Sequence, residues 1–193
     1  YFGDKDANTS LLSVGNMLAA VLVAISAPIF GRRSDEAGRR KFWLLVNSGV
    51  LIVIMALSYF VMPSPAFLLF GIALYAIGSV VQETAFINYY AMLKQVTTPK
   101  NIGKVSGFAW GLGYVGGILL LLLSLVGFVL PENPWFGVST EGAQNIRILF
   151  LFSAIWMLIF TIPLAIFVPE VPAKTAQNKE SLLQSYRSLF AQL

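Results

Sequence analysis

The chain has 193 residues, of which 57% are apolar and 11% are charged, and its formal net charge is +4. A soluble domain carries about 25% charged residues, so this composition predicts an integral membrane protein whose solvent is the bilayer. The sequence contains no cysteine and no histidine, which excludes disulfides, thiolate metal sites, Ser-His triads and His-ligated metals or haem. Membrane orientation explains the modest positive charge, so no nucleic-acid partner is expected.

Five apolar segments are long enough to cross a hydrocarbon core of about 30 Å as helices. They cover residues 11–30, 42–61, 66–93, 105–130 and 148–168. We therefore predict an all-α integral membrane fold with five transmembrane helices. In the first segment, small side chains follow one side of the predicted helix and are expected to pack against a neighbouring helix. These are Ser13, Asn16, Ala20, Ala24 and Ala27.

The loop between the first two segments, residues 31–41, carries five cationic side chains. Its pattern, Gly-x3-Asp-x2-Gly-Arg-Arg, resembles the signature between the second and third helices of major facilitator superfamily transporters. The matching residues are Gly31, Asp35, Gly38, Arg39 and Arg40. The resemblance implies a conformational latch, in which the acid meets a helix end of the second half of the transporter and the arginines bridge to cytoplasmic helix ends. The alternative is that the loop only fixes the orientation of the protein in the membrane.

The third segment contains Glu83, the only acidic or basic side chain inside a predicted span. A charge at the centre of a membrane helix costs about 2.5–3.5 kcal/mol on insertion scales, so Glu83 either has a function or avoids lipid. On a helical wheel it lies in a polar and aromatic stripe that is typical of the wall of a wet cavity. The stripe also contains Tyr75, Ser79, Gln82, Phe86, Tyr89 and Tyr90.

From this stripe we predict a substrate or coupling-ion site. Its residues are Glu83, Gln82, Ser79, Tyr75, Tyr89 and Tyr90. Glu83 would bind a proton, a cation or a cationic group of the substrate, and its neighbours would shape the pocket. The alternative is a structural hydrogen bond from Glu83 to another helix, or hydration near the inner mouth.

Before the fourth segment, Thr98-Pro99 predicts a helix N-cap followed by a first-turn proline. The helix itself carries glycines at intervals of four, beside Trp110 and Tyr114. Glycines with this spacing allow another backbone to approach closely, so we predict a helix-packing seam. A sliding surface during gating is the alternative. The glycines are Gly103, Gly107, Gly111, Gly113 and Gly117.

The loops that face one side of the membrane hold eleven Lys and Arg residues, and those on the other side hold two. The positive-inside rule therefore predicts that residues 1–10 are outside and residues 169–193 are cytoplasmic. An external start lacks the first helix of a facilitator half, so we expect the five segments to be helices two to six of an N-terminal six-helix bundle, residues 1–168. Residues 169–193 have the apolar spacing of an amphipathic helix, either a cytoplasmic linker between two halves or a loosely ordered end that binds lipid.

Two further stretches, residues 86–93 and 105–117, resemble a bacterial facilitator group called the unknown major facilitator family, which is related to the vacuolar amino-acid effluxers of fungal autophagy. The resemblance implies cofactor-independent secondary transport of a small solute such as an amino acid, in the efflux direction, across a bacterial inner membrane. The implied partners are lipid, the solute, a proton or cation, and a second six-helix half. The alternative is a membrane assembly or interaction subunit that transports nothing. An enzyme is not expected, since no catalytic pair can be assembled within these residues without His or Cys and with only one acid inside a predicted span.

Overall fold

The computed structural model describes Ser10 and residues 13–25 and 39–170. Several predictions therefore lie outside the described residues. They concern Gly31, Asp35 and Gly38 of the loop signature, residues 1–9, and all of the predicted amphipathic tail beyond Glu170.

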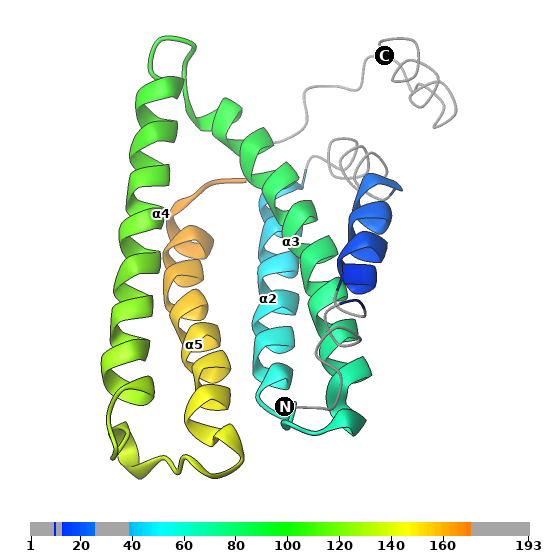
Figure 1. The fold of residues 1–193 in the computed structure, drawn as a ribbon. Coiled ribbons are helices and arrows are strands. Elements are labelled where there is room, and N and C mark those ends of the chain that lie inside the picture. Colours follow the sequence, from blue (N-terminus) through cyan, green and yellow to red (C-terminus); the bar gives the residue numbers. More distant parts are fainter. Residues whose placement is uncertain (1–9, 11–12, 26–38, 171–193) are drawn as a thin grey trace.

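Four long helices make up most of the described part of the chain, beside the shorter helix Ser13–Ile25 (Figure 1). They are α2 (Arg40–Ser58), α3 (Leu68–Val96), α4 (Ile102–Ser124) and α5 (Gln144–Phe167). Short elements join or extend them: η1 (Pro65–Phe67), a π-helical turn η2 (Leu125–Val129), η3 (Trp135–Gly137) and η4 (Glu141–Ala143). The described residues include no β-strand.

Four helical stretches are long and apolar enough to cross a membrane: Arg40–Ser58, Pro65–Leu93, Ile102–Val129 and Glu141–Phe167. The described part of the first predicted segment is a shorter apolar helix, Ser13–Ile25. These observations confirm the predicted all-α fold, since a bilayer leaves a chain no other way to satisfy its backbone polar groups except a closed barrel.

The helix bounds differ from the predicted ones by a few residues. The N-cap prediction at Thr98 is wrong, because Asn101 is the N-cap and α4 begins at Ile102. Thr98 and Pro99 instead form a turn before the helix, in which the Asn101 side chain accepts hydrogen bonds from the Thr98 amide at 2.7 Å and the Thr98 hydroxyl at 3.0 Å. The Thr98 carbonyl in turn accepts hydrogen bonds from the Asn101 and Ile102 amides at 3.0 and 2.9 Å, so this turn resembles a capping box and leads directly into α4.

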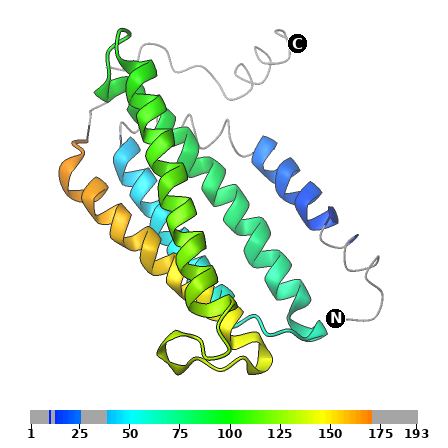
Figure 2. The same ribbon diagram turned by 60° about the vertical axis from the view of Figure 1, so that its left-hand side comes forward.

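Helix α2 packs along both α3 and α5, whereas α4 touches its neighbours only sparsely. Figure 1 shows α4 beside α5 and apart from α3, and the turned view in Figure 2 shows α4 in front of the other helices. The buried centre of the α2–α3 contact is formed by Leu44, Ala85 and Met92. Tyr89, Leu164 and Val168 pack against it, so the ends of α3 and α5 are joined through α2.

The helix Ser13–Ile25 meets α3 through a different side from the predicted one. Gly15 and Ala19 are its buried residues, and a Cβ atom at Gly15 would lie 2.8 Å from Cγ2 of Ile72. Asn16 and Ala20 of the predicted small-residue side are exposed. The predicted side therefore does not make the contact with α3, because a helix that is apolar all round does not reveal which face packs. Packing of that side against another helix stays a prediction.

An aromatic cluster closes the end of the bundle where α4 turns into α5. Phe128 is 2% exposed, and its ring lies 5.9 Å from the ring of Trp135 and 5.8 Å from that of Phe152. Asn145 donates a hydrogen bond to the Phe128 carbonyl at 3.0 Å, which satisfies a backbone group beside the π-helical turn. This cluster joins the end of α4 to the start of α5.

Candidate substrate-binding site

The predicted stripe of α3 lies largely on a side of the helix that other described residues leave open. Tyr75 is 56% exposed and Tyr90 is 41% exposed. Gln82 and Glu83 are also exposed. The Ser79 hydroxyl donates to the Tyr75 carbonyl at 2.9 Å, so its hydrogen is paired within the helix and its oxygen can still accept a hydrogen bond. Because α2 packs on the other side of α3, these side chains remain available to a ligand or to water.

Tyr89 departs from the rest of the stripe. Its ring packs against the buried cluster of Leu44, Ala85 and Met92, and it also lines a cavity between α3 and α4. Tyr89 therefore connects the packed side of α3 with the open side.

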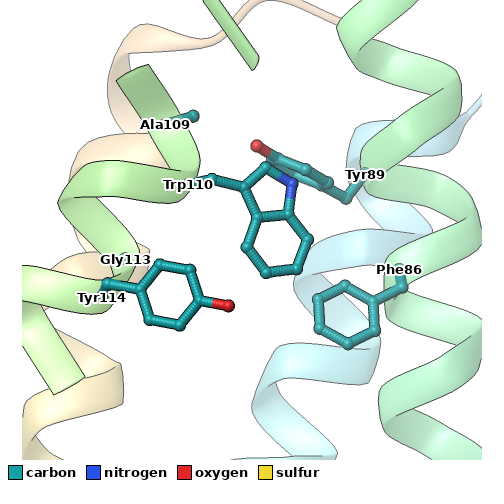
Figure 3. A pocket seen from close by; sticks show the side chains of 6 residues that line it. All are labelled: Phe86, Tyr89, Ala109, Trp110, Gly113 and Tyr114. Atoms are coloured by element: carbon teal, nitrogen blue, oxygen red, sulfur yellow. The ribbon is translucent and has the colours of Figure 1, made fainter. Parts of the chain in front are cut away.

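The cavity has a volume of about 330 Å³ and lies between two helices that are consecutive in the sequence. Figure 3 shows Trp110 and Tyr114 projecting from α4 toward Phe86 and Tyr89 of α3. The six lining residues are Phe86, Tyr89, Ala109, Trp110, Gly113 and Tyr114. Four of the six are aromatic and none is charged, so the walls of the cavity are flat ring systems with a few polar atoms.

Neighbouring rings hold one another in place on each wall. On α4 the Trp110 and Tyr114 rings are 5.9 Å apart. On α3 the Tyr90 ring lies 6.1 Å from Phe86 and 5.4 Å from Tyr89. These separations are within the range of favourable aromatic pairs, about 4.5–7 Å, so each wall is a preformed aromatic surface.

Trp110 and Tyr114 were not predicted as site residues, because their positions beside the glycines predict the flank of a packing helix. A signal was present. Tyr89 lies seven residues before the end of α3 at Val96, and Trp110 lies eight residues after the start of α4 at Ile102. Two helices joined by a short turn bring residues at equal distances from that turn to the same depth, about 10–12 Å at 1.5 Å per residue.

Gly113 lines the cavity, and the other glycines of the α4 stripe lie nearby on the same helix. A Cβ atom built at any of these positions would meet nothing within 4 Å among the described residues. They are Gly103, Gly107, Gly111, Gly113 and Gly117. Their role in helix packing therefore stays a prediction.

Most of the basic residues lie together at the end of the bundle where α2 and α4 begin and α3 and α5 end. We call this the basic end. Its cations with described side chains are Arg39, Arg40, Lys41, Lys100 and Lys104. The other described cation, Arg147, is at the opposite end, where its Nε donates to the Tyr59 carbonyl at 2.7 Å and its guanidinium lies 4.9 Å from the Tyr59 ring centre.

Glu170, which follows α5, contacts the start of α2 at the basic end. Its two carboxylate oxygens accept hydrogen bonds from the amides of Lys41 and Phe42, each at 3.0 Å. These amides are in the first turn of α2, where no side chain of the N-cap residue Arg39 bonds to them. A carboxylate at this position satisfies unpaired donors and complements the helix dipole, so Glu170 ties the end of α5 to the start of α2.

The two described arginines of the predicted latch contact this same end. Arg40 donates from Nη1 to the Ala91 carbonyl near the end of α3, at 3.2 Å. The guanidinium of Arg39 lies 5.2 Å from the centre of the Phe42 ring. Arg40 therefore joins α2 to α3 much as Glu170 joins α2 to α5, and the latch role itself stays a prediction.

Two further features lie away from this site. A second cavity of about 340 Å³ lies at the opposite end of the bundle, lined mostly by apolar residues around Met62, Phe67 and Phe150.

Asn88 of α3 is 1% exposed and donates to the Thr84 carbonyl at 2.9 Å. Among the described residues, no group of three or more acidic, His or Cys side chains could hold a metal ion.

Comparison with known proteins places the chain in a family. Residues 94–193, just over half of the chain, match the family model described as "Vacuole effluxer Atg22 like". The chain is also 29% identical over 159 residues to the Uncharacterized MFS-type transporter YxiO of Bacillus subtilis (strain 168), an alignment that covers 81% of this chain and 36% of the relative. The chain thus spans about a third of the length of this curated relative.

No solved structure matches the chain. The family model and the relative agree with the apolar helices and with the facilitator resemblance of the loop. The chain belongs to the vacuole effluxer Atg22-like family, a group of transporters of the major facilitator type.

Proposed function

We propose that the protein is a secondary active transporter that exports a small solute, such as an amino acid, by alternating access. The observation that carries this proposal is the open polar and aromatic side of α3, where Gln82 and Glu83 are exposed beside the aromatic cavity. In a membrane-spanning helix, exposed polar side chains are costly against lipid. They are therefore expected to line a water-filled path.

Glu83 is the proposed coupling or substrate-binding group. A carboxylate in a water-filled path can bind a proton, a cation or the cationic group of a solute. Gln82, Ser79 and Tyr75 supply hydrogen-bonding groups on the same side of α3. In this proposal, the segments that complete the path belong to the remainder of a two-half transporter, whose substrate site lies near the bilayer midplane between the halves.

We also propose an orientation. The basic end would face the cytoplasm of a bacterial cell and the aromatic end around Phe128 would face outward, because five of the six cations with described side chains are at the basic end. Residues 1–10 would then lie outside, and residues 169–193 would be cytoplasmic. The latch of Asp35, Arg39 and Arg40 would act on this cytoplasmic side.

The test is a flux screen of the full-length natural protein in liposomes, over amino acids and related solutes, with and without a pH gradient. We expect uptake or release of at least one solute, and a fall of about tenfold or more for Glu83→Gln. Glu132→Gln, the same substitution at an exposed position between α4 and α5, is the matched control and should leave the flux unchanged. If no solute moves, the protein is better described as an assembly or interaction subunit; if Glu83→Gln transports normally, Glu83 has no part in the mechanism.

A further inference from the structure

We propose that the cavity between α3 and α4 binds an ammonium group of the transported solute on the faces of its aromatic rings. The inference rests on the proposed transport function and names the substrate class: a small organic cation, or a zwitterion that presents an ammonium centre. Four observations support it: the arrangement of the rings, the charge of the surroundings, the unpaired polar atoms and the size of the cavity.

The arrangement of the rings is the first observation. Two aromatic walls face each other across the cavity, Phe86 and Tyr89 from α3 and Trp110 and Tyr114 from α4 (Figure 3). The faces of such rings carry negative electrostatic potential, and an ammonium ion within about 6 Å of a ring centre is attracted to them. Several rings around one space add their attraction, as in the aromatic cages that bind quaternary ammonium groups.

The charge of the surroundings is the second observation. None of the six lining residues is charged, so no cation competes for the ring faces inside the cavity. Glu83 lies three residues before Phe86 on α3, and side chains at this spacing are neighbours on a helix surface. A carboxylate one turn away would attract an ammonium group and repel an anion, so the site selects against anionic solutes.

The polar atoms of the aromatic side chains are the third observation. Among the described residues, no hydrogen bond reaches the indole N–H of Trp110 or the hydroxyl of Tyr114. These two side chains are 46% and 66% exposed. Unpaired polar groups facing hydrocarbon cost free energy, so the cavity is better suited to water and a polar solute than to a lipid chain.

The size of the cavity limits the solute. Its volume of about 330 Å³ is at the small end of ligand pockets, which span about 300–1,000 Å³. Ala109 has a small side chain and Gly113 has none, so this part of the α4 wall leaves space in the cavity. A Cβ atom at Gly113 would meet nothing within 4 Å, so a larger side chain there would extend into free space and reduce the cavity. The solute is therefore of amino-acid or choline size.

The experiment measures binding of defined probes to the full-length natural protein in detergent by isothermal titration calorimetry. The cationic probes are tetramethylammonium, choline and leucine methyl ester, and the neutral probe is 3,3-dimethyl-1-butanol, which has the shape of choline without its charge. We expect at least one cationic probe to bind, and choline to bind about tenfold more tightly than the neutral alcohol, which is the size of a desolvated cation–π contribution.

Variants separate ring electronics from packing. Trp110→Leu should weaken binding of the cationic probe about tenfold, and Gly113→Leu should weaken it by filling the cavity. Phe108→Leu is the matched control, because Phe108 is 70% exposed on the same helix and does not line the cavity. Fluorinated tryptophans at position 110 keep the shape of the ring and withdraw charge from its face, so affinity should fall stepwise with each fluorine. This series remains informative if Trp110→Leu fails to fold.

The inference is overturned if no cationic probe binds, if the neutral alcohol binds as tightly as choline, or if fluorination leaves the affinity unchanged. Its failure is distinct from failure of the transport proposal. Flux of other solutes without ammonium binding removes only the aromatic ammonium site. Trp110-dependent binding without flux of any solute removes transport and leaves the binding site in place.

Discussion

The two sides of α3 differ in what they contact. One side packs against α2 through Ala85 and Met92, and the other carries exposed Gln82, Glu83 and Tyr90. Both sides belong to one apolar helix in a bilayer, so hydropathy alone does not distinguish them. The packed side therefore stabilises the fold, whereas the open side, together with α4, is available to bind a ligand.

Adjacent residues of α3 give the strongest test of this difference. Ala85 is 8% exposed and Phe86 is 38% exposed. Ala85→Phe should lower the free energy of unfolding by about 3 kcal/mol, because the ring must enter a packed contact with α2. Phe86→Ala should cost less, about 1 kcal/mol for the lost ring pair with Tyr90, and should lower solute flux. Unfolding in SDS and flux in liposomes measure the two effects.

Ala73→Phe is the control for this pair, since Ala73 is exposed on α3 and the added ring should cost little there. Equal stability losses at positions 85 and 86 would mean that the two sides of α3 do not differ in packing.

The aromatic end around Phe128 offers a second, smaller test of packing. A Cβ atom at Gly127 would lie 2.5 Å from Cε3 of Trp135, so the Trp135 ring would have to shift from its edge contact with Phe128. Gly127→Ala should therefore destabilise the protein by about 2 kcal/mol. Gly49→Ala is the matched control, because nothing lies within 4 Å of a Cβ atom there and alanine is the better helix former. A thermal shift that is the same for both variants would contradict the close contact.

The basic end gives the smallest expected effect. Glu170→Gln keeps the size of the side chain but removes the charge that accepts hydrogen bonds from the Lys41 and Phe42 amides. We expect a loss of about 1 kcal/mol, as for a helix N-cap, visible as a lower midpoint of thermal unfolding. Glu132→Gln at the opposite end has no such contact among the described residues and should be neutral. A midpoint unchanged by Glu170→Gln would show that the cap does not stabilise α2.

The fold class could be predicted from the sequence because the length and hydropathy of a segment identify it as a membrane-spanning helix. The start of α4 could not, since a hydrogen-bonded turn from Thr98 to Asn101 precedes the helix, which begins at Ile102. The contact face of the helix Ser13–Ile25 was also missed, because glycine and alanine at Gly15 and Ala19 are no more distinctive than the small residues beside them.

The candidate site was predicted in part. Glu83 and its polar neighbours on α3 were found because a charge inside a span is rare. Trp110 and Tyr114 were not, since their meeting with Phe86 depends on how α4 lies against α3, which no pattern within one helix contains. The Glu170 cap was equally hidden, because it joins residues 129 positions apart in the chain.

Whether the open side of α3 faces water or lipid can be measured by thiol labelling. The full-length protein, freed of any cysteines outside this cysteine-free stretch, allows the variants Gln82→Cys and Ile77→Cys to be treated with a charged, membrane-impermeant thiol reagent. Both positions are exposed, and Ile77 lies outside the polar stripe. The account predicts rapid modification of Gln82→Cys, slowed by the transported solute, and almost none of Ile77→Cys. An unreactive Gln82→Cys variant, or equal reaction at both positions, would contradict it.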